Sequence, residues 1–269
     1  MPLRDIQIRI LKLLSENRSP ESYLAGGSLS GRTGDRFSDD LDLFHAGSDK
    51  TIQSYRIDKN VLEQAGYKVE PMTDPRPGFV RAVIEAPDGE KVKIDWAHES
   101  SFRFFPVIAD DLTGWQLHWA DAATNKVLAA GGREKPRDAF DILNWHHNPL
   151  SLGALVWAAV GKDPGFSPDL LLDEIVRNAR LSPTDLAKLR TVRPVDPIEL
   201  ATRFRNACRE ARTLVRRLPP ETVGHLFLNE VGEPIEPDPD RTETLARLHA
   251  GSERGCWPSF PSPDDDPAP

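Results

Sequence analysis

Two aspartates in an alternating segment are the residues of this chain whose types and spacing are best suited to chemistry. In the run DLDLF, the strand period of two places Asp40 and Asp42 on one face and Leu41 and Leu43 on the other. Neighbouring carboxylates repel each other, and a divalent cation is the usual remedy. The run therefore predicts a metal site on a strand whose opposite face is buried.

A glycine turn precedes these acids. The segment 22–25 runs apolar into Gly26 and Gly27, where missing side chains let the backbone approach a ligand and leave N–H groups for phosphate oxygens, and Ser28 adds a hydroxyl donor. Eleven residues then separate Ser28 from Asp40. A Gly-Gly pair or an Asp-x-Asp pair alone is usually a turn or a solvated face. Joined in this order, they predict a site for a triphosphate and two Mg²⁺ ions.

The joined pattern resembles the nucleotidyltransferase superfamily related to DNA polymerase beta, whose signature is a Gly-Ser turn followed by a strand with two metal-binding aspartates. The resemblance implies a third carboxylate on a neighbouring strand. In the run KVKIDW, alternation places Val92, Ile94 and Trp96 on one face and Asp95 on the other. The resemblance thus implies Asp40, Asp42 and Asp95 as catalytic metal ligands. It also implies nucleotide contacts from the turn and from the linker, which carries Arg32, Arg36 and Ser38.

A second block, residues 121–143, is similar to the AbiEii/AbiGii branch of abortive-infection toxins and to the MenT-like toxins. That resemblance implies Lys126 as a catalytic residue and a set of nucleotide-binding residues, namely Arg133, Arg137, Asp138 and Asp141. On a helix, the three cations share one side, which suits the phosphates of a nucleotide. Glycines 131 and 132 and Pro136 interrupt an ideal helix, so two short helices joined by a loop are expected.

Composition narrows the protein class. The 269 residues, 39% hydrophobic and 28% charged, are enough for one large domain or two small ones. A net charge of −8 does not suggest a protein that coats nucleic acid, although a local basic patch can override the total. Cys208 and Cys256 match no zinc or disulfide spacing, which fits a reducing cytosol. No targeting segment and no apolar run of ~18 residues is seen, so a cytoplasmic protein without membrane contact is expected.

The predicted fold class is α/β, with a small mixed-sheet nucleotidyltransferase domain over residues 1–118 and a helical domain over 119–250. Trp115 and Trp119 are expected at the seam, and 251–269 as a disordered, acidic, Pro-rich tail. Helices are predicted at 1–14 and 52–65, strands at 67–72, 80–86 and 90–96, and helices almost throughout from 120. Ser167-Pro168, Ser182-Pro183 and Asp196-Pro197 are the expected starts of three of them.

Two further clusters leave alternatives open. An arginine stripe recurs at i, i+4, i+7 and i+11, formed by Arg205, Arg209, Arg212 and Arg216. Such a stripe can track RNA phosphates, pair with an acidic antitoxin, or simply face solvent. The histidines at 146 and 147 are expected to point to different sides of a helix end, which makes a poor metal site and favours a capping or solvent role.

The resemblance implies a Mg²⁺-dependent enzyme that transfers a nucleoside monophosphate from an NTP, with the 3′ end of tRNA as acceptor and a cognate antitoxin protein as partner. A second interpretation keeps the chemistry and replaces the acceptor by an antibiotic or a protein hydroxyl. A third is a non-catalytic nucleotide-sensing or protein-binding module, against which all three acids and the turn argue.

Overall fold

A mixed seven-stranded sheet carries the three predicted acids. The structure, a computed structural model, describes residues 3–29, 36–99 and 102–251. The strands lie in the order β3-β4-β5-β2-β1-β7-β6. Their bounds are β1 Ser22–Ala25, β2 Asp40–His45, β3 Lys68–Pro71, β4 Phe79–Glu85, β5 Lys91–His98, β6 Ile108–Asp110 and β7 Gly114–Gln116.

The registers at the centre of the sheet follow from short connections. β4 and β5 form an antiparallel hairpin in which Glu85 lies opposite Lys91 and Arg81 opposite Asp95. β2 lies parallel to β5 and antiparallel to β1, so it is hydrogen-bonded on both edges. The predicted strands at 67–72, 80–86 and 90–96 are confirmed, with ends that differ by one or two residues.

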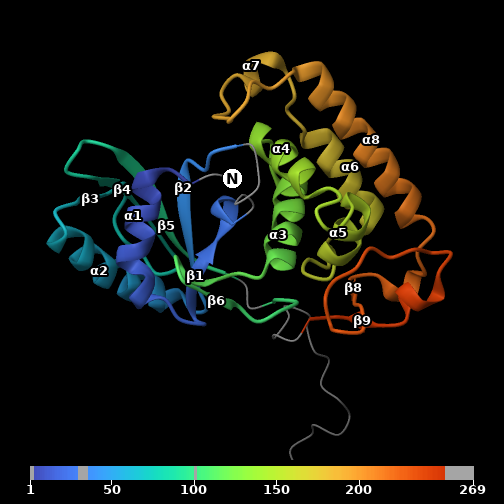
Figure 1. Cartoon of the computed structure of the whole chain (residues 1–269), viewed down its shortest axis with the longest axis horizontal. Coiled ribbons are helices and arrows are strands. Elements are labelled where there is room, and N and C mark those ends of the chain that lie inside the picture. The colour runs from blue at the N-terminus through green and yellow to red at the C-terminus, as the bar shows by residue number, and fades with distance from the viewer. Residues whose placement is uncertain (1–2, 30–35, 100–101, 252–269) are drawn as a thin grey trace, which may run out of the picture.

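Two helices cover one face of this sheet. α1 Asp5–Leu14 and α2 Ser48–Gln64 bury Ile6, Ile10 and Leu62 against the apolar face of β4 and β5 (Figure 1). α2 begins four residues earlier than predicted, because Ser48 and Asp49 suit a first helical turn. It ends at Gln64, one residue before the predicted end, and Gly66, with a φ of +85°, follows as the predicted stop. One face of the sheet is thus a core face, and the catalytic candidates must lie on the other.

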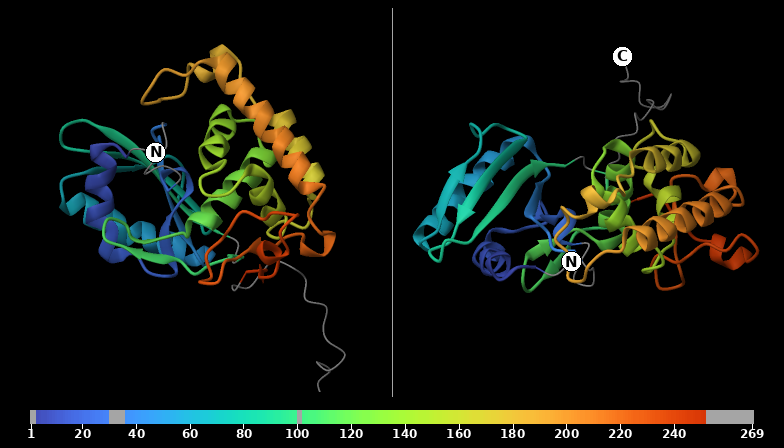
Figure 2. Two further views of the ribbon diagram at one scale, coloured as in Figure 1. Left: turned by 45° about the vertical axis from the view of Figure 1, so that its right-hand side comes forward. Right: turned by 90° about the horizontal axis from the view of Figure 1, so that it is seen from above.

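Six helices follow the sheet and pack beside it (Figure 2). They are α3 Trp119–Gly132, α4 Pro136–Trp145, α5 Leu152–Ala159, α6 Pro168–Asn178, α7 Pro183–Leu186 and α8 Pro197–Val215. The break between α3 and α4 is confirmed. The predicted starts of α6, α7 and α8 are confirmed as well, and in each the residue before the proline caps the helix with its side chain. The chain is not helical throughout, however, since β8 Leu226–Phe227 pairs with β9 Leu248–His249.

Two hydrophobic clusters divide the described residues. One runs from Ile6 to Trp96, and the other from Phe102 to Phe227 with Tyr23 and Ala25 of β1 added. β7 links the two parts, because it pairs with β1 in parallel. The limits 1–118 and 119–250 stay a proposal, and Cys256 and the predicted tail beyond Gly251 lie outside the described residues. None of the described helices is long and apolar enough to cross a membrane.

A buried ion pair fixes the chain just before β1. Asp58 of α2 accepts hydrogen bonds from Arg18 at 2.5 and 2.7 Å, from Asn17 at 2.9 Å and from the Trp96 indole at 2.7 Å. Arg18 and Asp58 have almost no exposed side-chain surface. Removing one partner would leave an uncompensated charge inside the protein.

We therefore expect Asp58→Ala to lower the free energy of unfolding by about 3–5 kcal/mol, measured by urea denaturation. Glu63→Ala on the same helix is the matched control. Its pair with Lys59 is 3.7 Å long and solvent-exposed, so its loss should cost about 0.5 kcal/mol or less. Equal, small losses in both variants would show that the Asp58 network does not stabilise the fold.

Candidate active site

The sheet register brings the three aspartates together on one face. Asp42 of β2 lies opposite Asp95 of β5, which lies opposite Arg81 of β4. Asp40 is two residues before Asp42 and so shares its face. Adjacent strands are about 4.8 Å apart, so the acids occupy neighbouring positions of one sheet surface.

Asp42 has the most unfavourable surroundings of the three. Burial, and then the carboxylates of Asp40 and Asp95, raise its pKa to about 6. Its carboxylate lies directly against the turn η2 Gly26–Ser28: a Cβ at Gly26 would stand 1.8 Å from Asp42 Oδ2. Gly26 also has a φ of +67°, so the turn needs glycine twice over.

The turn differs from the prediction in one respect. The Gly27 N–H is not free for a phosphate, because it points at Asp42 Oδ2, 3.3 Å away. A carboxylate next to a backbone N–H is the favourable arrangement, so the turn places Asp42 before any ligand is bound. The side chain of Ser28 and the whole of Arg32 lie outside the described residues.

Asp95 and Asp40 are each paired with a guanidinium. Arg81 holds both oxygens of Asp95, with Nε to Oδ1 at 2.7 Å and Nη2 to Oδ2 at 2.5 Å. Arg137 Nη1 lies 3.5 Å from Asp40 Oδ2, and the Ser38 hydroxyl donates to the Asp40 backbone carbonyl at 2.8 Å. Arg137 thus lies beside Asp40, and Ser38 fixes the start of β2, while their predicted contacts with a nucleotide stay predictions.

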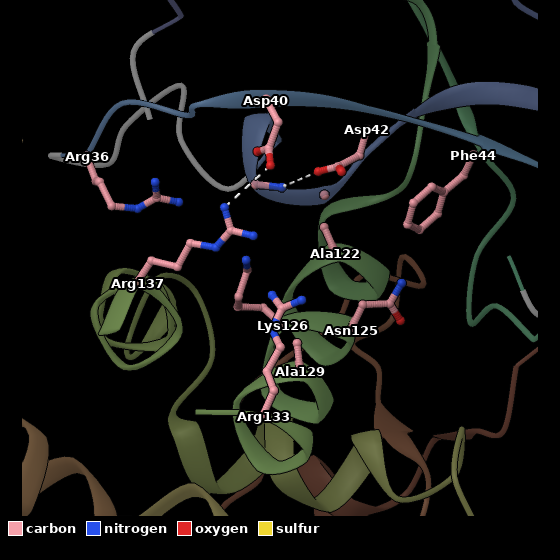
Figure 3. A pocket seen from close by; sticks show the side chains of 12 residues that line it. Arg36, Asp40, Asp42, Phe44, Ala122, Asn125, Lys126, Ala129, Arg133 and Arg137 are labelled. Carbon is pink, nitrogen blue, oxygen red and sulfur yellow. Dashed lines mark hydrogen bonds and ion pairs between the residues drawn. The ribbon is translucent and has the colours of Figure 1, made fainter. Parts of the chain in front are cut away.

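The cationic residues reach the site from α3 and α4, which face the strand across a pocket (Figure 3). Lys126 lies 3.0 Å from Asp141 and 3.7 Å from Asp138. Arg133 pairs with Asp138 at 2.7 and 3.0 Å. The break at 133–135 does not remove Arg137 from this wall, because α4 turns back toward β2.

Asp138 and Asp141 are fully occupied by these cations. Burial would raise the pKa of Asp141, but Lys126 and Arg36 outweigh it and hold that pKa below its usual value. Arg36 forms a two-pronged pair with Asp141 at 2.8 and 3.0 Å. The loop after α7 holds this segment from behind, since the Phe37 N–H donates to the Arg190 carbonyl at 2.8 Å. Both carboxylates therefore orient cations toward the pocket.

The pocket contains more residues than the sequence singled out. It is lined by Gly26, Gly27, Arg36, Asp40, Asp42, Phe44, Ala122, Asn125, Lys126, Ala129, Arg133 and Arg137. Phe44, Ala122, Asn125 and Ala129 were missed, although the period of two puts Phe44 on the face of Asp40 and Asp42, and helical spacing puts Ala122 and Ala129 on the face of Lys126. The sequence analysis also missed Arg81. The hairpin turn at 87–89 could have found it, because pairing residue 86 with 90 places 81 opposite 95.

A second cluster departs from prediction. The rings of His146 and His147 do not point to different sides: they lie 3.9 Å apart, because His147 has a φ of +60°, and both approach Glu210. Among the described residues these three have ligand atoms within 4.8 Å of one another. His146 Nδ1, however, accepts the Leu152 N–H at 3.1 Å, so its neutral ring carries the proton on the nitrogen that faces Glu210. The capping role is thus confirmed, and a metal there would have to displace that proton.

The fold is the one that the sequence motifs led us to expect. The structure is similar to MenT4, a nucleotidyltransferase toxin from Mycobacterium tuberculosis H37Rv, with a TM-score of 0.52, 17% identity, and coverage of 80% of this chain and 83% of that one. The chain has a nucleotidyltransferase fold. At the level of sequence, no protein-family model and no curated protein matches it.

Two more solved structures are less similar to this nucleotidyltransferase fold. A nucleotidyltransferase structure from H. pylori has a TM-score of 0.48 and 18% identity over 80% of this chain and 94% of its own. The Cid1 poly(U) polymerase has a TM-score of 0.26 and 15% identity over 63% of this chain and 49% of its own. The first similarity confirms the predicted α/β class and nucleotidyltransferase fold.

The donor set of the three acids fits a hard divalent cation. Carboxylate oxygens are the ligands that Mg²⁺ prefers, and burial followed by the neighbouring carboxylates of Asp40 and Asp95 raises the pKa of Asp42, so a cation there would relieve an unfavourable charge. Because residue 26 has no side chain, the turn leaves room for the Asp42 carboxylate, and a Cβ at this position would collide with it. The residues present therefore suit the metal that the resemblance implies.

The raised pKa of Asp42 implies that, without metal, the free energy of unfolding depends on pH through this carboxyl group. Above pH 6 the ionised carboxylate opposes folding, whereas below about pH 4 it is protonated in both states and costs nothing. We expect Asp42→Asn to raise the free energy of unfolding in EDTA by about 3 kcal/mol at pH 7, with the gain shrinking toward zero near pH 4. Denaturation curves across this range provide the measurement. The exposed neighbour Asp39→Asn is the control, and a pH-independent gain at position 42 would contradict the assignment.

Proposed function

We propose that this chain is a metal-dependent nucleotidyltransferase that transfers a nucleoside monophosphate from an NTP to an acceptor hydroxyl and releases pyrophosphate. One observation carries the proposal: the β2 carboxylates of Asp40 and Asp42 face a wall of cations on α3 and α4 across one pocket, and Asp95 of β5 lies next to Asp42 in the register. Phosphoryl transfer uses both charge types, because carboxylates bind the metal ions while cations stabilise the charge of the triphosphate.

Each residue then has a role set by its surroundings. Asp40, Asp42 and Asp95 would hold Mg²⁺, which when bound neutralises phosphate charge and favours the ionised acceptor hydroxyl. Lys126, Arg133 and Arg137 would contact the triphosphate oxygens. Asp138, Asp141 and Arg36 act one step back, by fixing the direction of Lys126 and Arg133. Ser28 stays a predicted phosphate ligand.

The bonds, charge and proton of the proposed transfer are all accounted for by the substrate and the residues of the site. The acceptor oxygen forms a bond to the α-phosphorus while the bond from that phosphorus to the α–β bridging oxygen breaks. The electron pair of that bond leaves with pyrophosphate, whose added charge Lys126 and Arg137 are placed to stabilise. The proton of the acceptor hydroxyl goes to the carboxylate of Asp95, which Arg81 keeps oriented by its two hydrogen bonds.

For the acceptor, we propose the 3′ end of tRNA, and for the biological role a growth-arresting toxin with a cognate antitoxin. The motif block at 121–143 supports this proposal, as does the similarity in fold to a protein described as a nucleotidyltransferase toxin. A cationic antibiotic as acceptor would fit poorly beside a wall of lysine and arginine. A non-catalytic module would not require three acids with their positioning partners.

The metal ligands provide the first test of function. Purified protein is incubated with each labelled NTP, Mg²⁺ and total cellular RNA, and the labelled macromolecule is identified. Asp40→Asn and Asp42→Asn should each abolish transfer, since losing one ligand of a two-metal site costs several kcal/mol of transition-state stabilisation, about 10³-fold or more. Activity within tenfold of wild type in both variants would remove these residues from the site.

Lys126 provides the second test. Lys126→Ala should lower kcat by ~10²-fold or more, because it removes charge stabilisation of the leaving pyrophosphate. The fold should survive, since Asp141 keeps its pair with Arg36 and Asp138 keeps its pair with Arg133. Turnover is compared with thermal melting on the same preparation. A variant that melts early but is fully active per folded molecule would make Lys126 a structural residue.

A further inference from the structure

The sheet face that carries the acids continues past them, over β5 and β4, as an exposed surface. Alternation along β4 buries Val80, Ala82 and Ile84 under the helices and leaves Phe79 and Arg81 on the opposite side. Alternation along β5 does the same for Lys93. This surface is therefore continuous with the row of aspartates, on the side of Asp95 away from the nucleotide-binding wall.

The strand registers place these side chains in rows. Arg81, Asp95 and Asp42 form one row across three strands. In the next row, Phe79 of β4 and Phe44 of β2 flank Ala97 of β5. Neighbouring rows on one face are two residues apart along a strand, and neighbouring strands are one strand spacing apart. Phe79 therefore lies diagonally beside Asp95. An aromatic ring thus stands next to the carboxylate proposed to accept the proton of the acceptor.

Phe79 is exposed without an evident role in the core. Its side chain is 44% exposed, and Arg81 lies over its ring at 5.3 Å from the centroid. A solvent-exposed phenylalanine on a sheet surface, held by an arginine that also pairs with Asp95, is a preformed stacking surface. Asp95 holds the Arg81 guanidinium in place over one part of the ring. The exposed part of the ring is available to a partner.

Lys93 is the cation of this surface whose charge is not paired. Within the described ranges it makes no ion pair, whereas its neighbour Lys91 is paired with Glu85 at 2.7 Å. It lies beside Asp40 in the register, one row from Asp95. A free lysine one row from the carboxylate, on the opposite side from Phe79, is suited to a backbone phosphate of a strand whose terminal base is stacked on the ring.

We infer that Phe79 and Lys93 form the docking surface for the single-stranded 3′ end of a polynucleotide acceptor, whose terminal base stacks on Phe79 while a backbone phosphate contacts Lys93. This inference rests on the proposed function and specifies its acceptor side. A flat, open face with one aromatic ring and one free cation suits a strand, whose backbone and bases need contacts of both kinds. It gives no enclosure for a small molecule.

The arginine stripe of α8 is the competing surface. Arg205, Arg209, Arg212 and Arg216 line a groove between α8 and α6, whereas Arg203 on the other flank lies beside α4. Arg212 is already paired with Asp173 of α6 at 2.5 Å. The stripe therefore lies on the flank of α8 away from α4 and Arg137, while the Phe79 surface is directly continuous with the acids.

The test measures RNA binding and NTP binding separately on the full chain. A fluorescein-labelled RNA hairpin with a short single-stranded 3′ overhang is titrated by anisotropy at several salt concentrations, and a blunt hairpin of the same stem is titrated alongside it. Phe79→Ala should weaken binding of the overhang RNA about five- to tenfold. Lys93→Gln should weaken it severalfold and make the log–log salt slope shallower by about 0.7–0.9. NTP affinity should stay within twofold in both.

Matched controls separate docking from general effects. Ile57→Ala removes an apolar side chain of equal exposure, 45%, from the helix side of the sheet. Lys91→Gln removes a charge from the same strand that Glu85 already neutralises. Both should leave RNA binding within twofold of wild type. The triple change of Arg205, Arg209 and Arg212 to Gln should also leave the overhang preference intact.

Each other outcome decides against one statement. Wild-type overhang binding in both Phe79→Ala and Lys93→Gln overturns the inference, and a loss confined to the arginine triple variant moves the RNA to α8. If wild type transfers nucleotides to a small molecule or a protein and binds no RNA, the docking surface is wrong while nucleotidyl transfer stands. If it binds the overhang through Phe79 and Lys93 but transfers nothing from any NTP, the surface stands and the proposed activity fails.

Discussion

The mutual repulsion of three carboxylates on one sheet face is the constraint on which the rest of the site depends. Asp40, Asp42 and Asp95 stand at neighbouring register positions, and the pKa of Asp42 is raised to about 6 by its burial and then by the carboxylates of Asp40 and Asp95. The chain contains the repulsion from two sides, with Arg81 on Asp95 and Arg137 near Asp40. Arg137 comes from the helical part, so the charge balance of the acids joins the sheet to the helices. A site with uncompensated charge at its centre and guanidinium groups at its edges has its strongest attraction for a cation at Asp42.

The opposite wall is built by the reverse arrangement, in which buried carboxylates direct cations. Asp141 receives Arg36 from the linker before β2 and Lys126 from α3, and Asp138 receives Arg133. An ammonium group that is 7% exposed is costly to bury without such a partner. Because Asp141 holds one group from each part of the chain, the distance between the acids and the phosphate-binding cations is fixed by a single carboxylate. The cations of this wall are thus oriented mainly by ion pairs with buried carboxylates rather than by packing.

Local pattern was enough to predict most of the elements that carry these residues. Alternation places Asp40, Asp42 and Asp95 on the sheet face opposite the apolar core, and the Ser-Pro and Asp-Pro pairs mark the starts of α6, α7 and α8. Even the position of Arg81 opposite Asp95 follows from the hairpin register, although the family motif that implies Asp95 contains no arginine. Pattern could not predict contacts across long stretches of chain or an unusual backbone conformation. The parallel pairing of β7 with β1, the clamp of Arg190 on Phe37 and the approach of His147 to His146 each depend on tertiary closure or on a φ that the sequence does not mark.

Arg81 has a position that links the two halves of the proposed reaction. One side of its guanidinium holds both oxygens of Asp95, and the group also lies over the ring of Phe79. A carboxylate held in this way keeps one orientation, because a two-pronged pair with a planar group resists rotation. The same contact fixes the aromatic ring at the height of the acids. The direction of the proton acceptor and the surface proposed for the acceptor strand are therefore set by one residue. A lysine could not replace it, since a point charge can neither occupy both oxygens in a plane nor stack on the ring while it does so.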